Sequence, residues 1–355
     1  MQNWVLPSFF IAIFVLSLQH AWGQDPQFSQ YYAAPLHLNP SLTGGFDARY
    51  RVSSIYRDQW RGPLEEAINT FGASLDLRFD LQSRALAGDA FGVGIQFVTD
   101  QAGSLNLSTN SISLLGAFHK SLGQSNTNYL SAGIQFSTVQ RNLLYKNLVF
   151  QDQFNGVDSY TGPTGEDLPA NNYSFGDFAF GLNYFSAPSS SFSLFAGGVV
   201  HHILEPEVSF YRKDDDENQQ QLSESSLFRK YSFHGGITTR LSENIDISPR
   251  TFVLKQRAHT AITVGNNFII EPSTTDAFNF HLGAWVRTVQ DLEAKFAPDM
   301  IGFLAGMGIG NLLIGLSYDV NIRDVVNYPT GQGAFEVSIS YFGDYQDEGT
   351  ICPTF

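Results

Sequence analysis

The sequence predicts an all-β protein, a transmembrane outer-membrane antiparallel β-barrel of about 14 strands with an N-terminal arm that acts as a plug. Three observations predict this class: a period-two alternation of large apolar with small or polar residues, a secretory leader, and connections of alternating length. Aromatic residues make up 14% of the 355 residues, and charged residues make up 15%. The charged share of ordinary proteins is about 25%. This profile excludes a disordered chain, a coiled coil and a collagen.

Residues 1–23 are expected to be a cleaved secretory signal peptide. The apolar run 4–18 is followed by Ala21-Trp22-Gly23, which supplies the small-x-small cleavage pattern. About fifteen apolar residues are short for a membrane span of roughly 20, so cleavage is favoured over an anchored helix. No later apolar run reaches that length, and we expect a mature chain that starts at Gln24 and is located in the Gram-negative outer membrane.

Residues 24–48 form the second segment, an N-terminal arm. Its three prolines exclude a long helix or a central strand. The segment is also too aromatic for a free tail. We therefore expect an ordered arm that either tucks into the barrel lumen or caps its periplasmic mouth.

The barrel itself is predicted over residues 49–342. Large apolar residues such as Phe91 and Val93 alternate with Gly92 and Gly94, so each segment has one apolar face and one small or polar face. A soluble sandwich or propeller also fits this alternation. The membrane barrel is favoured because the apolar faces end in aromatic residues and the opposite faces carry Gly, Ser, Asn and charge, which are poor material for a dry core. The residues expected to face lipid are Phe91, Val93, Ile95, Phe178, Phe180, Leu316, Tyr318, Val337 and Ile339.

Fourteen strands are predicted, an even number as expected of single-chain barrels. The predicted strands are 49–58, 68–80, 90–100, 107–120, 128–139, 174–187, 191–203, 228–241, 244–255, 257–270, 277–289, 298–308, 311–320 and 334–342.

The connections between these strands fall into two classes. The short ones, 187–190, 242–244 and 308–311, are expected at the periplasmic side, with a periplasmic C-terminal tail at 343–355. The long ones, 140–173, 204–227 and 321–333, all fall on the outer side. This asymmetry is typical of outer-membrane barrels.

Two long connections carry candidate features. Segment 140–173 holds the partner-binding candidates and is expected to fold over the pore mouth. Segment 204–227 contains the charged run 213–221, which we interpret as a solvated loop, since the Gly and Glu spacing of a calcium loop is missing. The partner-binding candidates are Tyr145, Phe150, Phe154, Tyr160 and Tyr173.

No catalytic, metal-binding or cofactor-binding residues are predicted, so the protein is not expected to be an enzyme. The net charge of −14 argues against a nucleic-acid partner. A single cysteine, Cys352, excludes an intramolecular disulfide framework. His234 precedes two glycines without a nucleophile elbow, and we interpret it as a lumen-facing histidine. His201 and His202 are adjacent in a predicted strand, so we expect them to face opposite ways rather than to share a metal.

Several charged residues fall at inward positions of the predicted strands. A buried charge needs a partner or water. Two interpretations remain open: an ion-pair network that plugs or stiffens the lumen, and a selective channel. The residues are Arg57, Asp76, Arg78, Asp319 and Glu336.

The arm carries an ordered set of motifs. It reads Gln-Asp-Pro-Gln-Phe-Ser-Gln-Tyr-Tyr over residues 24–32 and Leu-Asn-Pro-Ser-Leu-Thr-Gly over residues 38–44. Tyr-Arg-Asp-Gln-Trp follows at 56–60, and the chain ends in Cys-Pro-Thr-Phe. This combination resembles the PorP/SprF family of type IX secretion system membrane proteins. The matching motif residues are Asp25, Pro26, Gln27, Phe28, Tyr31, Tyr32, Asn39, Pro40, Tyr56, Arg57, Gln59 and Trp60.

The resemblance implies a non-enzymatic accessory barrel that aids the secretion or surface anchoring of a cognate secreted protein, such as a gliding adhesin. Its implied partners are outer-membrane lipid, a client protein with a C-terminal secretion signal, and the translocon or periplasmic motor-linked components of the system. We expect the client at segment 140–173 and the periplasmic contacts at the short turns and the arm. The alternative is a transporter of hydrophobic small molecules like the fatty-acid channels of the outer membrane.

Overall fold

The computed structural model describes residues 25–344 apart from 62–66, 82–87, 104–106, 124–125, 146–147, 211–225, 273–277, 291–293 and 323–332. The predicted signal peptide, the charged run 213–221 and Cys352 lie outside these residues.

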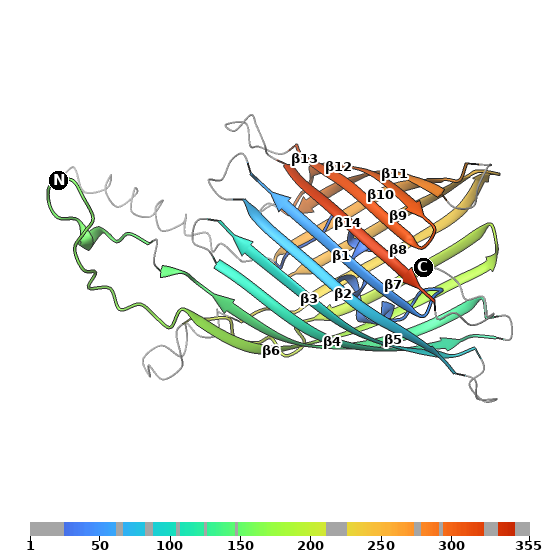
Figure 1. Ribbon diagram of the computed structural model, residues 1–355, viewed down its shortest axis with the longest axis horizontal. Coiled ribbons are helices and arrows are strands. Elements are labelled where there is room, and N and C mark those ends of the chain that lie inside the picture. Colours follow the sequence, from blue (N-terminus) through green and yellow to red (C-terminus); the bar gives the residue numbers. More distant parts are fainter. Residues whose placement is uncertain are drawn as a thin grey trace, which may run out of the picture.

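Fourteen antiparallel strands of the described residues form one closed barrel (Figure 1), which confirms the predicted fold class. Each overlaps one predicted strand. They are β1 (Tyr50–Gln59), β2 (Ile68–Asp80), β3 (Ala90–Ala102), β4 (Leu107–Ser121), β5 (Asn128–Asn142), β6 (Asn172–Ser189), β7 (Phe192–His201), β8 (Lys230–Ser242), β9 (Ile245–Gln256), β10 (His259–Ile270), β11 (Phe278–Gln290), β12 (Phe296–Ile309), β13 (Leu312–Asn321) and β14 (Gly333–Gly343).

The first and last strands close the barrel. β1 pairs with β14 along its whole length, from Tyr50 opposite Gly343 to Gln59 opposite Ala334. Closure leaves no unpaired sheet edge around the wall, which is the condition for a sheet to cross a bilayer. No helix among the residues described is long and apolar enough to span a membrane.

The two faces of the wall differ as the alternation predicts. Ile95 is 46% exposed on the outer surface, whereas the next residue, Gln96, is buried in the lumen. The residues expected to face lipid all point outward; Val337 is half-buried and the others are exposed. Apolar side chains therefore cover the outside, and Ser, Asn and charged residues line the inside.

Ile95→Arg tests this assignment. Ile95 lies near the middle of β3 and points outward, so we expect the substitution to destabilise the barrel in lipid by roughly 2–4 kcal/mol. Leu241→Arg, near the end of β8, is the matched control and is expected to cost roughly 0–1 kcal/mol. Reversible unfolding in liposomes measures both values, and equal costs would contradict the outward, mid-membrane placement of Ile95.

The two ends of the barrel differ. The strand ends that the long connections 143–171, 202–229 and 322–332 join all lie at one end, here called the long-loop end. The two-residue turns between β6 and β7 and between β8 and β9 lie at the opposite end, here called the short-turn end.

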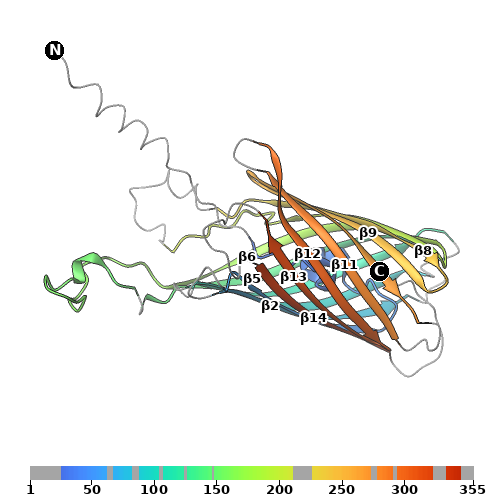
Figure 2. The same cartoon turned by 90° about the horizontal axis from the view of Figure 1, so that it is seen from above.

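From the sequence we predicted that segment 140–173 folds over the pore mouth, and this prediction is wrong. Loop 143–171 projects away from the barrel (Figures 1 and 2). Residues 172–179 of β6 pair with β5 alone, because the pairing with β7 begins at Phe180. Strands β4, β5 and β6 thus continue together beyond the start of the β6–β7 pairing, with β6 at the edge, and the ends of β5 and β6 carry the loop outward.

Candidate functional site

Residues 25–49, the arm, run through the inside of the barrel (Figure 1). The arm has no regular structure longer than one turn: η1 (Tyr31–Ala33), α2 (Pro35–Leu38) and η2 (Pro40–Leu42). Pro35 and Pro40 begin the two later turns, where the missing N–H costs nothing. The lumen placement predicted from sequence is confirmed, and the alternative, a cap over the periplasmic mouth, is not observed.

The direction of the arm was not anticipated. Asp25 contacts His202 and Lys230 at the long-loop ends of β7 and β8. The other end of the arm joins β1 at the short-turn end, where Arg49 donates a backbone hydrogen bond to Gly343. The arm therefore starts at the long-loop end and crosses the lumen, so only its last residues reach the side where we expected its partner contacts.

The start of the arm is held by the Asp25 cluster, which consists of Asp25, Asp177, His202 and Lys230. His202 donates from Nε2 to Asp25 at 2.6 Å and from Nδ1 to Asp177 at 2.9 Å, and Lys230 Nζ lies 2.6 Å from Asp25. Burial lowers the pKa of His202, but the carboxylates of Asp25 and Asp177 outweigh it and raise the pKa to about 9. Burial raises the pKa of Asp25, but Lys230 and His202 together hold it well below its ordinary value.

The expected opposite facing of His201 and His202 is wrong. β7 ends at His201, and His202 has a φ of 56°, which breaks the strand alternation. Both side chains are buried, with ring centroids 6.1 Å apart. The backbone turn is what brings His202 to Asp25.

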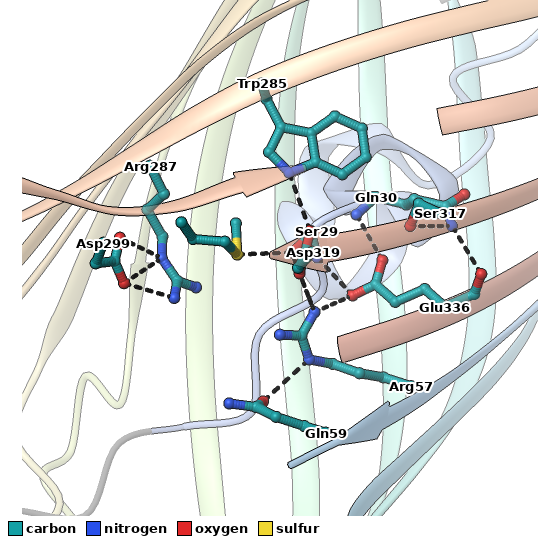
Figure 3. A network of polar contacts seen from close by, with 11 residues as sticks. Ser29, Gln30, Arg57, Gln59, Trp285, Arg287, Asp299, Ser317, Asp319 and Glu336 are labelled. Atoms are coloured by element: carbon teal, nitrogen blue, oxygen red, sulfur yellow. Dashed lines mark hydrogen bonds and ion pairs between the residues drawn. The ribbon is translucent and has the colours of Figure 1, made fainter. Parts of the chain in front are cut away.

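A second layer of contacts holds Ser29 and Gln30 (Figure 3). Their backbone N–H groups donate to the two carboxylate oxygens of Glu336 at 2.7 and 2.8 Å, and the Ser29 hydroxyl donates to Asp319 at 2.5 Å. Arg57 pairs with Glu336 and, at 3.0 Å, with Asp319. All three charged residues are buried.

The side chains around this layer satisfy the remaining polar atoms (Figure 3). Gln59 accepts from Arg57 Nε at 3.1 Å, and Trp285 Nε1 donates to Asp319 at 3.2 Å. Gln30 Nε2 donates to Ser317 at 2.8 Å. The predicted inward charges are thus joined to the arm, which supports the ion-pair interpretation of these residues.

Asn39 holds the middle of the arm. Its Nδ2 donates to the Leu182 carbonyl at 3.1 Å and lies 3.1 Å from His234 Nε2, while its Oδ1 accepts from the Ser41 N–H at 2.9 Å. His234 is buried and faces the lumen, as predicted.

The last layer lies near the short-turn end. Asp76 pairs with Arg51 at 2.7 Å and accepts from the Gly44 N–H at 2.8 Å. Arg78 donates to the Gly44 carbonyl at 2.9 Å, and His119 Nε2 donates to the Thr43 carbonyl at 2.8 Å. The backbone of the arm is therefore hydrogen-bonded to the wall at residues 29–30 and again at residues 42–44, with the Asn39 side chain between them.

Inward-facing glycines make room for the arm. A Cβ added to Gly92 would overlap the Thr43 carbonyl, and one added to Gly133 would overlap the backbone of Pro40 and Ser41. The small residues on the inner face are thus a seat for the arm.

The matching motif residues of the arm and β1 build this interface. Phe28 is buried against Ile55, Tyr31 stacks on Phe252 with ring centroids 5.1 Å apart, and Pro26 accepts from His37 at 3.2 Å. Tyr56 and Trp60 do not take part, since both are exposed.

The aromatic partner-binding candidates do not form one cluster. Phe154 and Tyr160 lie at the tip of loop 143–171, 44% and 53% exposed, with ring centroids 5.1 Å apart. Phe150 and Tyr145 are half-buried in the loop. Tyr173 belongs to β6 and packs perpendicular to Phe210 at 4.8 Å. Only the first pair is presented at the tip.

Sequence reasoning missed several residues that hold the arm: Arg51, His119, Asp177, His202 and Lys230. Their strand positions place most of them inward, but nothing in the sequence indicates which inward residues meet the arm.

Raising the pH from 7 to 10 is expected to loosen the start of the arm. The folded pKa of His202 is about 9, above its ordinary 6.5, so its stabilisation is complete below about 6.5 and is lost as the pH rises through about 9. Asp25 stays ionised in this window, and the nearby His37, whose pKa burial lowers to about 4, stays neutral. Amide hydrogen exchange of residues 25–30, corrected for the intrinsic pH dependence, should increase. His202→Gln is the control, which should exchange faster already at pH 7; unchanged protection of the parent at pH 10 would contradict the assignment.

Comparison with known proteins gives one family. The family described as type IX secretion system membrane protein PorP/SprF matches residues 21–341. No curated protein matches significantly. Among solved structures, the TodX monoaromatic hydrocarbon channel deltaS2 mutant is similar, with a TM-score of 0.48 and 10% identity, covering 88% of this chain and 94% of that one. A FadL homologue from Pseudomonas aeruginosa has a TM-score of 0.46 and 12% identity, covering 87% and 94%.

Proposed function

The chain belongs to the PorP/SprF family of type IX secretion system membrane proteins, and from this membership we propose that it is a non-enzymatic accessory barrel of the outer membrane that holds a cognate secreted protein at the cell surface. In this proposal the long-loop end faces outward and the short-turn end faces the periplasm, which is the usual arrangement of outer-membrane barrels. The client is a secreted protein with a C-terminal secretion signal, such as a gliding adhesin. The translocon or the motor-linked periplasmic components contact the short turns.

The observation that carries the proposal is the tip of loop 143–171, residues 150–165, here called the loop tip. It is folded by its own hydrogen bonds: Asn155 Oδ1 accepts from the N–H groups of residues 157, 158 and 159, and Asp152 accepts from the Gly165 N–H at 2.6 Å. Phe154 and Tyr160 pair across the tip as an isolated bridge.

A loop tip that is already folded loses little entropy when it binds. Aromatic side chains bring a large contact area with few rotatable bonds, and such residues dominate the binding energy of protein interfaces. Phe154 and Tyr160, together with Val157 at 80% exposure, form an apolar surface held well clear of the membrane-spanning wall. This surface suits a protein partner.

The lumen supports anchoring over transport of hydrophobic molecules. It contains the arm, and the wall facing the arm carries buried polar and charged residues such as Arg57, Asp76 and Glu336. A path for hydrophobic solutes needs apolar lining. The barrel then serves as a fixed support for the loop tip.

Phe154→Ser combined with Tyr160→Ser tests the client site. We expect normal barrel assembly, since connecting segments tolerate change, and the transfer of one or a few proteins from the cell surface to the medium. Glu166→Ser combined with Asp167→Ser, exposed on the same loop, is the matched control and should release nothing. Quantitative mass spectrometry of cell-attached and secreted fractions measures the result. If the aromatic variant leaves both fractions unchanged, the loop tip is not the client site.

A further inference from the structure

A small cavity of about 20 Å³, with room for roughly one or two water-sized species, lies in the lumen between the arm and strands β9–β12. It is one of the parts of the lumen that the arm and the wall leave open; another lies beside Phe28, His37 and Lys230. Its lining includes Tyr31, Tyr32, Arg250, Thr263, Asn267 and Trp285.

Arg250 lacks the carboxylate partner that three other arginines of the lumen have. Arg51, Arg57 and Arg78 each form an ion pair with a carboxylate. Within the described part of the chain, no carboxylate lies within ion-pair distance of Arg250. Its Nε donates to the Ser248 hydroxyl at 3.1 Å, and its guanidinium carbon lies 4.7 Å above the Tyr32 ring.

Three further polar atoms of the residues that line this pocket are buried and have no hydrogen-bond partner among the described residues. They are the Tyr32 hydroxyl, Asn266 Oδ1 and Asn267 Oδ1; Asn267 uses its Nδ2 to reach His281 Nδ1 at 3.0 Å. Buried polar atoms of folded proteins are almost always satisfied. The Tyr32 hydroxyl and the guanidinium of Arg250 are both donors, whereas the side-chain oxygens of Asn266 and Asn267 are acceptors, which suit a hydration water or a ligand hydroxyl.

We propose that this pocket binds a small solvent anion, a halide or a simple carboxylate, through Arg250 and the Tyr32 hydroxyl. A cation withdrawn from water requires a counter-charge, and a contact with an aromatic ring is a weaker substitute. A guanidinium has several N–H donors, so the bond to Ser248 leaves donors for the anion.

Instead of a bound anion, the carboxylates around Arg57 could balance the charge of Arg250, because there two carboxylates face one arginine. Neither Asp319 nor Glu336 forms an ion pair with Arg250. If the excess negative charge of Asp319 and Glu336 neutralised Arg250 at a distance, the pocket would not prefer anions to cations. A comparison of an anionic with a cationic quencher distinguishes these two cases.

Trp285 in the pocket wall is a built-in reporter. Of the four tryptophans, Trp4 and Trp22 precede Gln24, so Trp60→Phe leaves Trp285 as the one indole of residues 24–355. In the refolded barrel we expect iodide to quench Trp285 fluorescence saturably and about tenfold more strongly than caesium, because a fixed positive charge concentrates anions. Neutral acrylamide reports access to the pocket without regard to charge.

Arg250→Gln should reduce iodide quenching to the level of caesium and leave acrylamide quenching unchanged. Arg250→Lys should retain the iodide preference, and Lys255→Gln, which removes an exposed charge from the same strand, should have no effect. If Arg250→Gln does not fold, protection of Trp285 from iodide by acetate at constant ionic strength supports the proposal in its place. Equal quenching by iodide and caesium in the parent, retention of the preference in Arg250→Gln, or no quenching by any of the three reagents would each overturn it.

Discussion

Replacing Arg57 by Met is expected to destabilise the barrel by about 3–5 kcal/mol, the usual effect of breaking a buried ion pair from one side. Arg57 is the cation shared by Asp319 and Glu336, and all three are buried. Its removal leaves two neighbouring carboxylates in the lumen, and their oxygens are the acceptors that hold Ser29 and Gln30. We therefore expect the arm to loosen together with the wall.

Arg287→Met is the matched control. Arg287 pairs with Asp299 at 2.7 Å, but the two side chains are 23% and 16% exposed, so water can replace the lost partner. Its cost should be about 1 kcal/mol. Denaturant unfolding of the refolded barrel measures both variants, and trypsin or chymotrypsin digestion reports the arm. If Arg57→Met unfolds at the same denaturant concentration as Arg287→Met, the layer of contacts around Arg57 does not hold the fold together.

The barrel could be predicted from sequence because its signal is local. Alternation at Phe91, Val93 and Ile95 needs only the geometry of one strand, and the same pattern repeated fourteen times gives the count. The strand pairs that closure creates, such as Tyr50 opposite Gly343, then follow from the order of the strands.

The contacts of the arm could not be predicted in this way. A proline-containing segment without periodicity has no strand pairing that would fix its position. The sequence therefore indicated that the arm needs burial, but not at which end of the lumen it starts. The Asp25 cluster depends on Lys230, which is more than 200 positions away along the chain, and on the positive φ of His202. The arm motifs identified the right residues, but only the closed barrel supplies their partners.

The direction of the arm has a consequence for the proposed function. In the proposed orientation, Asp25 and the base of β6, which carries the loop tip, lie at the same end of the lumen, joined through Asp177 and His202. The other end of the arm is continuous with β1 at the side of the short turns. One segment of chain, the arm, thus connects the outer end of the barrel to its periplasmic end.

Gly133→Val is expected to displace the arm from the lumen and leave the strands paired. Gly133 lies in β5 opposite the backbone of Pro40 and Ser41, and even a single Cβ there would overlap main-chain atoms. A backbone on a hydrogen-bonded path cannot rotate away as a side chain would, so the overlap forces residues 39–43 off the wall. Once Asn39 leaves, its hydrogen bond to the Leu182 carbonyl and its contact with His234 are lost as well.

The measurement is proteolysis of the arm in the folded, detergent-solubilised barrel. In the parent, residues 25–49 should resist chymotrypsin despite Phe28, Tyr31 and Tyr32, because the lumen shields them. In Gly133→Val they should be cut within minutes, while the barrel retains its β-sheet circular dichroism and its resistance to unfolding in SDS at room temperature. Gly116→Val is the matched control, since a Cβ at Gly116 meets no atom closer than 4.0 Å and the arm should stay protected. Continued protection of the arm in Gly133→Val would mean that Pro40 does not rest against β5. It would contradict the inference that the inward-facing glycines make room for the arm.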